Sequence, residues 1–170
     1  MAQTAQAETG FRVVVFADFV CPYSYLAVDQ IDRLAREYDL KPLWRPHWLH
    51  PETPLEGTPR ETTPEALARR ERLKAWIKEM APEIYPRIRF PERRQYSFRA
   101  FEALELAYDC GVDFEFKTVL YDMMWTEGAD IADVDTLVTA GERVGIDPAE
   151  MREALEQGAY IQRALDAVNG

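Results

Sequence analysis

The chain has 170 residues, of which 47% are hydrophobic and only 8 are glycine. This length and composition fit one globular domain, or a compact core with one sizeable insertion, rather than a disordered or fibrous protein. The formal net charge is -10 at pH 7. Nucleic acids and anionic membrane surfaces are therefore poor partners, because both attract clustered Lys and Arg.

The first ten residues, 1–10, are polar and carry a single charged side chain, Glu8. They lack the basic and apolar segments of a secretory signal, and we expect them to form a disordered tail. No apolar run approaches the roughly 20 residues that a membrane-spanning helix needs. Two cysteines, Cys21 and Cys110, cannot form a disulfide framework. These observations favour a cytoplasmic protein with reduced thiols and no membrane association.

The first elements form a strand–helix–strand unit. Residues 12–18 are an apolar, β-branched run, which predicts a strand buried on both faces, as in parallel sheets. From Pro22 onward, apolar residues recur at helical spacing up to Tyr38, and they predict an amphipathic helix. Residues 41–48 predict a second strand, at most an edge strand because it contains two prolines. This order implies a right-handed βαβ crossover.

After a proline-rich loop at 51–59, the pattern predicts helices up to the end of the chain. Ser, Thr and Asp caps, first-turn prolines and closing glycines set their boundaries. The predicted helices span residues 64–80, 97–110, 114–126, 133–144 and 148–169.

The motif Cys21-Pro22-Tyr23-Ser24 lies where the first strand ends and the helix begins. Free N–H groups of a first helical turn, together with the positive end of the helix dipole, stabilise an anion at this position. A thiolate is both the nucleophile and the leaving group of disulfide exchange. Position alone therefore indicates a reactive thiol at Cys21, with an inert packed cysteine as the alternative.

The run FADFVCPYSYLA at residues 16–27 resembles the active-site segment of DsbA-like thioredoxin-fold oxidoreductases, especially their cytosolic FrnE-like branch. It is also similar to kappa-class glutathione transferases and 2-hydroxychromene-2-carboxylate isomerases, which carry serine where this chain has Cys21. Residues 44–57 resemble the FrnE-like second strand and loop, and residues 97–169 resemble the helical insertion of the group. In this family the motif cysteine attacks disulfides, so the resemblance implies that role for Cys21.

The resemblance implies an α/β fold, a thioredoxin-like βαβ core with a large all-α insertion. Residues 11–60 would be the N-terminal βαβ half of the domain, and residues 61–170 the helical insertion domain. Relatives continue with a cis-proline loop, two antiparallel strands and a final helix, whereas this chain ends at Gly170. We therefore expect that the C-terminal strands are missing, and that a longer chain or a homodimer completes the sheet.

Ser24 departs from the dithiol pattern of many relatives, in which a second cysteine resolves the mixed disulfide. This departure predicts a monothiol mechanism, in which Cys21 and Ser24 are the catalytic residues and an outside thiol such as glutathione is the co-substrate. No permanently bound cofactor is expected, and the partner would be a protein or small-molecule disulfide or thiol. Two alternatives stay open: a glutathione-dependent transferase or isomerase, and a non-catalytic, redox-dead binding protein or fragment.

Other residues of the active-site turn have local interpretations. Asp18 favours a role in binding the backbone of the turn, with a proton relay as the alternative. Pro22 begins the helix, and Tyr23 is expected to shape substrate access.

Elsewhere in the chain, structural roles are favoured. Cys110 is expected to be a buried, inert thiol. His47 and His50 have no cysteine or acidic partner at the spacing of metal ligands, so we expect no metal site. Residues 121–125 are expected to face the core, with a substrate-binding role as the alternative. The acidic residues of 102–109 are expected on a solvated face.

Overall fold

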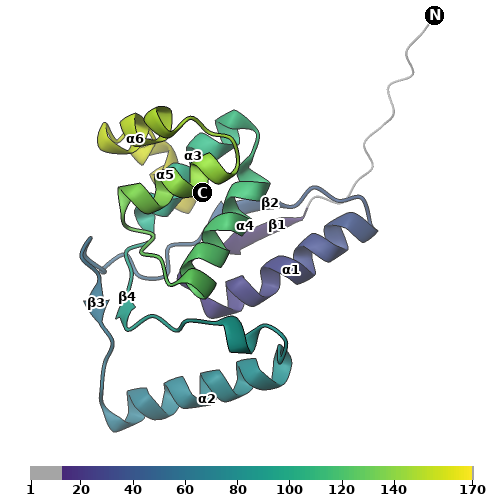
Figure 1. Ribbon diagram of the computed structural model, residues 1–170, viewed down its shortest axis with the longest axis vertical. Coiled ribbons are helices and arrows are strands. Elements are labelled where there is room, and N and C mark those ends of the chain that lie inside the picture. The colour runs from purple at the N-terminus through teal and green to yellow at the C-terminus, as the bar shows by residue number, and fades with distance from the viewer. Residues whose placement is uncertain (1–12, 170) are drawn as a thin grey trace, which may run out of the picture.

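The computed structural model describes residues 13–169, and the predicted N-terminal tail lies outside the described residues. Strands β1 (Val14–Ala17) and β2 (Leu43–Pro46) are parallel neighbours, joined by helix α1 (Pro22–Glu37) (Figure 1). Val14 pairs with Leu43 and Ala17 with Pro46. The parallel βαβ unit that the sequence predicts is therefore confirmed.

Helices dominate the rest of the chain, as predicted. They are α2 (Pro64–Met80), α3 (Phe98–Cys110), α4 (Asp113–Asp122), α5 (Val134–Arg143), α6 (Pro148–Glu156) and α7 (Ile161–Asn169). A 3₁₀ turn occupies Tyr85–Arg87, and a π-helical segment, Met123–Glu127, continues α4. Short strands β3 (Thr58–Pro59) and β4 (Arg93–Arg94) pair antiparallel, which the sequence did not predict.

The single final helix predicted for 148–169 is wrong, because the chain breaks into α6 and α7. Gly158 adopts a left-handed conformation with φ of 64°, and the Ala159 N–H bonds the Ala154 carbonyl (2.9 Å). That pattern ends a helix. A Cβ at position 158 would also lie 2.6 Å from the Ile161 side chain, so the turn needs glycine.

Helix α3 is the centre of the helical body and packs against α4, α5, α6 and α7. Its alanines, including Ala100, Ala103 and Ala107, are fully buried and let neighbouring helices approach closely. The prediction of a solvated acidic face is wrong for Glu102 and Glu105, which are both buried. Arg163 of α7 covers Glu105 with an ion pair of 2.7 Å, a partner that local sequence cannot reveal. Cys110, expected to be buried, is exposed at the end of this helix.

The prediction that the first strand is buried on both faces is also wrong. Val15 and Ala17 of β1 pack in the core with Val28 of α1, but Val14 and Phe16 point to the other face and are 43% and 60% exposed. Among residues 13–169, β2 is the only strand that pairs with β1. The homodimer expected to complete the sheet stays a prediction.

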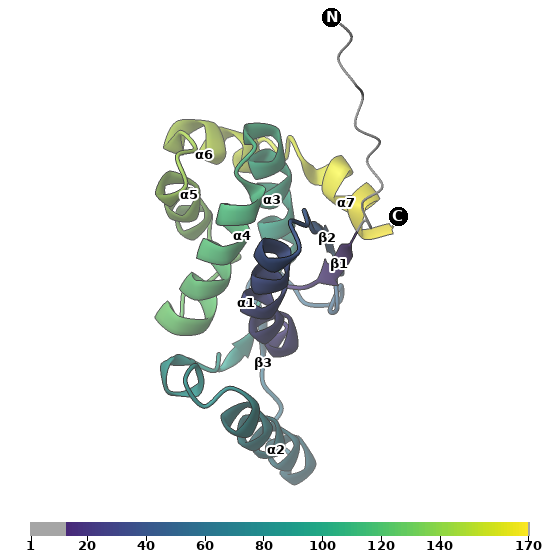
Figure 2. The same cartoon turned by 90° about the vertical axis from the view of Figure 1, so that its right-hand side faces the viewer.

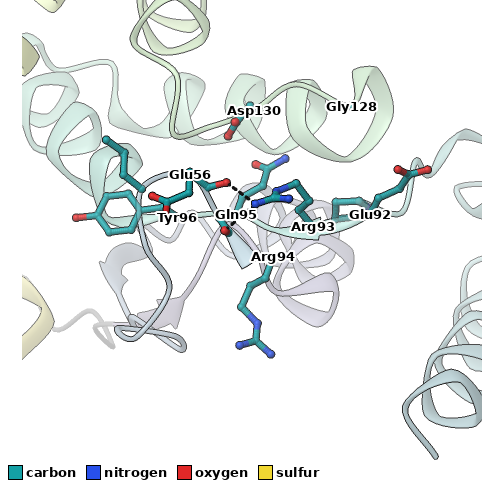
Figure 3. A pocket seen from close by; sticks show the side chains of 11 residues that line it. Glu56, Glu92, Arg93, Arg94, Gln95, Tyr96, Gly128 and Asp130 are labelled. Carbon is teal, nitrogen blue, oxygen red and sulfur yellow. Dashed lines mark hydrogen bonds between the residues drawn. The ribbon is translucent and has the colours of Figure 1, made fainter. Parts of the chain in front are cut away.

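Helix α2 lies at the opposite end of the molecule from α6 (Figures 1 and 2). It begins at Thr63, whose hydroxyl accepts the Ala66 N–H (3.2 Å), the predicted cap. The β3–β4 ladder lies between α2 and the helical body, and Arg93 donates to the Gly57 carbonyl (2.9 Å) there. A small pocket of about 230 Å³ lies beside this ladder, and the side chain of Arg94 extends away from it (Figure 3).

Candidate active site

The turn between β1 and α1 is held by the buried carboxylate of Asp18. One carboxylate oxygen accepts the Val20 N–H (3.2 Å) and the other accepts the Leu49 N–H (2.9 Å). Burial raises the pKa of Asp18, while these two donors and the Ser97 hydroxyl oppose the shift. The contacts are those of a residue that binds backbone, and they join the turn to the segment after β2.

Two aromatic side chains from the helical body also bind this turn. The Tyr121 hydroxyl donates to the Asp18 carbonyl (3.1 Å), and the Trp125 indole N–H donates to the Phe19 carbonyl (2.9 Å). Trp125 lies in the π-helical segment, an irregularity that often occurs at functional sites. The backbone leading to Cys21 is thus fixed from several directions before α1 begins.

Cys21 is the N-cap residue of α1, with extended backbone (φ -88°, ψ 116°), and is half-buried. Pro22 follows at the first helical position and has no N–H, so Tyr23 and Ser24 carry the first free donors of the helix. With the residues described, the Cys21 side chain makes no capping hydrogen bond. Its sulfur therefore lies at the N-terminal end of α1, beside the positive end of the helix dipole.

Ser24 is half-buried in the first turn of α1, near the buried Tyr121. Burial, and then the charge of Asp18, raise the pKa of Tyr121 well above its usual value, while the Ser24 hydroxyl opposes that shift. Tyr121 is thus a neutral hydroxyl that donates to the backbone of the turn and lies near Ser24.

A cavity of about 670 Å³ opens beside Cys21 and extends under α2. Tyr23 and Trp76 contact each other across it, with ring centroids 5.1 Å apart, and both are largely exposed. Phe90 and Trp125 form a further apolar wall. The volume lies within the range of small-molecule sites, and its wall is mainly aromatic and aliphatic.

Positive charge lines the same cavity, although the whole chain is strongly acidic. Six basic side chains and one carboxylate, Glu61, line it. The basic residues are Arg60, Arg69, Arg70, Arg72, Lys74 and Arg94. Burial and the neighbouring charges of Arg94 and Arg70 lower the pKa of Arg60. Like charges are crowded here beside the candidate nucleophile.

The remaining candidates from the sequence lie in different surroundings. His50 lines the cavity, and its Nδ1 lies 3.2 Å from a carboxylate oxygen of Glu52, whereas His47 is exposed. In residues 13–169, no cluster of three or more His, Cys, Asp or Glu could hold a metal ion. Cys110 lies outside the cavity. Burial, Glu150 and Asp109 raise its pKa.

The sequence profile of the DsbA-like thioredoxin domain matches residues 12–167, nearly the whole chain. The chain belongs to the DsbA-like thioredoxin family. The resemblance that residues 16–27 carry is thereby confirmed, as is the α/β fold class. Within the described residues, no helix is both long and apolar enough to cross a membrane.

The chain is similar at low sequence identity to a curated relative and to several solved structures. The uncharacterized protein YwbO of Bacillus subtilis is 26% identical over 156 residues, covering 89% of this chain and 76% of its own. A 2-hydroxychromene-2-carboxylate isomerase superposes with a TM-score of 0.70 at 20% identity, over 94% of this chain and 78% of its own. The cytosolic disulfide reductase DsbM of Pseudomonas aeruginosa, solved with GSH, superposes with a TM-score of 0.61 at 15% identity, over 92% of this chain and 77% of its own.

The family resemblance pointed to the turn at Cys21 as the candidate active site, but not to the cavity beside it. The structure brings Cys21, Pro22 and Tyr23 together at the cavity, whereas Ser24 is not among the residues that line it. Sequence reasoning missed the basic residues, Trp76 and Phe90, because α2 and the β3–β4 ladder bring them to Cys21 from distant segments. The one available signal was the concentration of arginine in 60–72 of an otherwise acidic chain.

Proposed function

We propose that this DsbA-like protein is a monothiol thiol–disulfide oxidoreductase with Cys21 as its nucleophile. The observation that carries the proposal is the position of Cys21, at an uncapped helix start and open to a cavity of about 670 Å³. In the reaction, the Cys21 thiolate attacks one sulfur of a disulfide. The S–S bond breaks, a mixed disulfide with Cys21 forms, and one thiolate leaves.

An outside thiol then completes the cycle. Ser24 has no sulfur, and Cys110 lies outside the cavity. The incoming thiolate attacks the mixed disulfide, forms a new disulfide with the bound group and releases the Cys21 thiolate. Glutathione is the proposed resolving thiol and the cytoplasm the proposed compartment. Both are supported by the DsbM reductase, a fold relative described as cytosolic and solved with GSH.

Intact-mass measurement tests the reaction directly. Reduced protein treated with glutathione disulfide should gain one glutathionyl group, mapped to Cys21 by peptide digestion, and should lose it again on adding glutathione. A Cys110→Ser variant is the matched control and should behave like the wild type. Labelling of both cysteines at equal rates would overturn the assignment of Cys21 as the nucleophile.

Ser24→Cys tests the monothiol mechanism. Positions 21 and 24 are one helical turn apart, within the Cα separation that a disulfide spans. We expect the variant to form an internal disulfide and to lose the glutathionyl adduct, because the introduced thiol would resolve the adduct in place of free glutathione. Persistence of the adduct in the variant would show that position 24 cannot reach the sulfur of Cys21.

A glutathione-dependent transferase or isomerase is the second candidate, favoured by the aromatic lining of the cavity. Tyr23, Trp76 and Phe90 could hold an apolar electrophile beside the thiol of a glutathione molecule that Cys21 helps to bind. Consumption of glutathione with an aromatic electrophile, dependent on Cys21 and without any disulfide product, would favour this candidate. A protein that shows neither chemistry would be a non-catalytic binding protein.

A further inference from the structure

The cavity beside Cys21 has more positive charge than a simple thiol substrate needs. Lys74 pairs with Glu71 (2.8 Å) and Arg94 with Glu52 (3.0 Å). The other four cavity arginines have no ion pair with any acid of residues 13–169. The six cations are opposed by three carboxylates, Glu61 and the two ion-pair partners Glu71 and Glu52, so the cavity keeps a net charge of three positive units. Unpaired like charges destabilise a fold unless an anion neutralises them.

The type and place of these side chains favour phosphate. Five of the six cations are arginines, whose planar guanidinium groups bind phosphate oxygens in pairs. Arg60 and Arg70 are half-buried, and the Nε of Arg94 is buried without a partner in the described structure. A partly desolvated arginine with a free donor gains more from an anion than an exposed one does.

The rest of the cavity fits an organic ligand with a planar ring. Tyr23 and Trp76 are 56% and 40% exposed although both line the cavity, so they present ring surface for stacking. Aromatic side chains of this kind stack on nucleobases. The site is concave, with cations on α2 and on the β3–β4 ladder, which suits a small molecule rather than an extended acidic peptide.

We propose that the disulfide substrate of Cys21 carries several phosphate groups, as the disulfide of coenzyme A does. The inference rests on the proposed thiol exchange and names its substrate class. Glutathione brings about one net negative charge at pH 7, whereas coenzyme A brings about four from its phosphates. The Cys21 thiolate attacks the disulfide, one phosphorylated thiolate leaves, and the other remains bound to Cys21. Glutathione then attacks this mixed disulfide, forms a glutathione–coenzyme A disulfide and restores Cys21.

Rates of mixed-disulfide formation test the substrate class. Reduced wild-type protein is mixed with coenzyme A disulfide, glutathione disulfide or uncharged bis(2-hydroxyethyl) disulfide, each rate being divided by that of N-acetylcysteine with the same disulfide. We expect coenzyme A disulfide to exceed glutathione disulfide by about tenfold at low salt, and added salt to reduce this preference. Equal normalised rates for the three disulfides would overturn the proposal without touching the proposed function.

Charge variants locate the preference in the cavity. In Arg60→Gln/Arg70→Gln, the ratio of the coenzyme A rate to the uncharged rate should fall about tenfold. Arg33→Gln/Arg36→Gln removes two exposed charges from α1 and should leave this ratio unchanged. An equal fall in both variants would assign the preference to overall charge and overturn the site.

Protection of Cys21 from iodoacetamide separates binding from chemistry. Adenosine 3′,5′-bisphosphate has the phosphates and ring but no sulfur, and we expect it to slow alkylation of Cys21 and not of Cys110. Protection without any disulfide exchange at Cys21 would keep the phosphate site and overturn the oxidoreductase. Disulfide exchange at Cys21 without protection by the bisphosphate would keep the oxidoreductase and overturn the phosphate site. Protection by a polyglutamate peptide alone would replace the small phosphorylated thiol with an acidic peptide.

Discussion

The two cysteines occupy opposite kinds of helix end. Cys21 lies at the N-terminal end of α1, open to a cavity lined by six basic side chains. Cys110 is the last residue of α3, where the partial charge of the helix is negative, and Asp109 and Glu150 lie close enough to raise its pKa. Both thiols are accessible, so exposure alone does not distinguish them. The direction of the helix and the nearby charges do.

The largest expected effect is on activity. Cys21→Ser should reduce disulfide exchange by a factor on the order of 10³, because a hydroxyl at this position is neither an effective nucleophile nor a leaving group. Cys110→Ser should leave the rate unchanged. Steady-state reduction of a disulfide by glutathione measures both variants. Substantial activity in Cys21→Ser would show that the Cys21 thiol is not the nucleophile, and the contrast between the two cysteines would then have no bearing on function.

Helix α3 gives the second test, because its buried acids contrast with the cation-rich cavity. Burial raises the pKa of Glu102 to about 7, with Arg99 opposing the shift. The folded protein therefore retains a proton that the unfolded chain loses from about pH 4.5, and Glu102 lowers the free energy of unfolding as the pH rises to about 7. Glu102→Gln should match the wild type at pH 4 and exceed it at pH 8 by about 3 kcal/mol.

Denaturant unfolding at the two pH values measures this difference. Glu142→Gln is the control, since Glu142 is exposed and should show the same pH dependence as the wild type. Glu105 and Asp18 also have raised pKa values, so a residual decline with pH is expected in the Glu102 variant. A variant that loses stability in parallel with the wild type would show that Glu102 titrates as a solvated acid.

These contrasts also mark what sequence could reveal. The βαβ unit and the Thr63 cap were predicted because local sequence patterns mark the strands, the helices and the cap. The burial of Glu105 on α3 was missed because Arg163 of α7 covers it from more than fifty residues away. The candidate nucleophile came from a local motif, whereas the arginines around it come from α2 and the β3–β4 ladder. Only tertiary structure shows that they meet Cys21 in one cavity.

The third test compares the two thiols in one molecule. At pH 7, iodoacetamide should modify Cys21 faster than Cys110 by about tenfold, because the thiolate is the reactive form and Cys110 lies among negative charges. Glu150→Gln removes one of those charges and should narrow the difference. Peptide mass spectrometry after short exposures gives both rates from the same sample. Faster modification of Cys110 would reverse the assignment of the two helix ends.

The smallest expected effect is on stability, and it comes from the same substitution that abolishes activity. Helix α2 has a capping hydrogen bond from Thr63, whereas α1 has none from Cys21. A serine at position 21 can accept an N–H bond from the first turn, so Cys21→Ser should raise the free energy of unfolding by about 0.5–1 kcal/mol. Thr63→Ala should lower it by about 1 kcal/mol, which checks the size of the effect in this protein. Thermal and denaturant unfolding measure both variants.

If Cys21→Ser is inactive and more stable, then the uncapped start of α1 is a feature retained for chemistry at a cost in stability. A loss of stability in Cys21→Ser would show instead that packing of the sulfur, rather than the free helix end, determines the residue at this position.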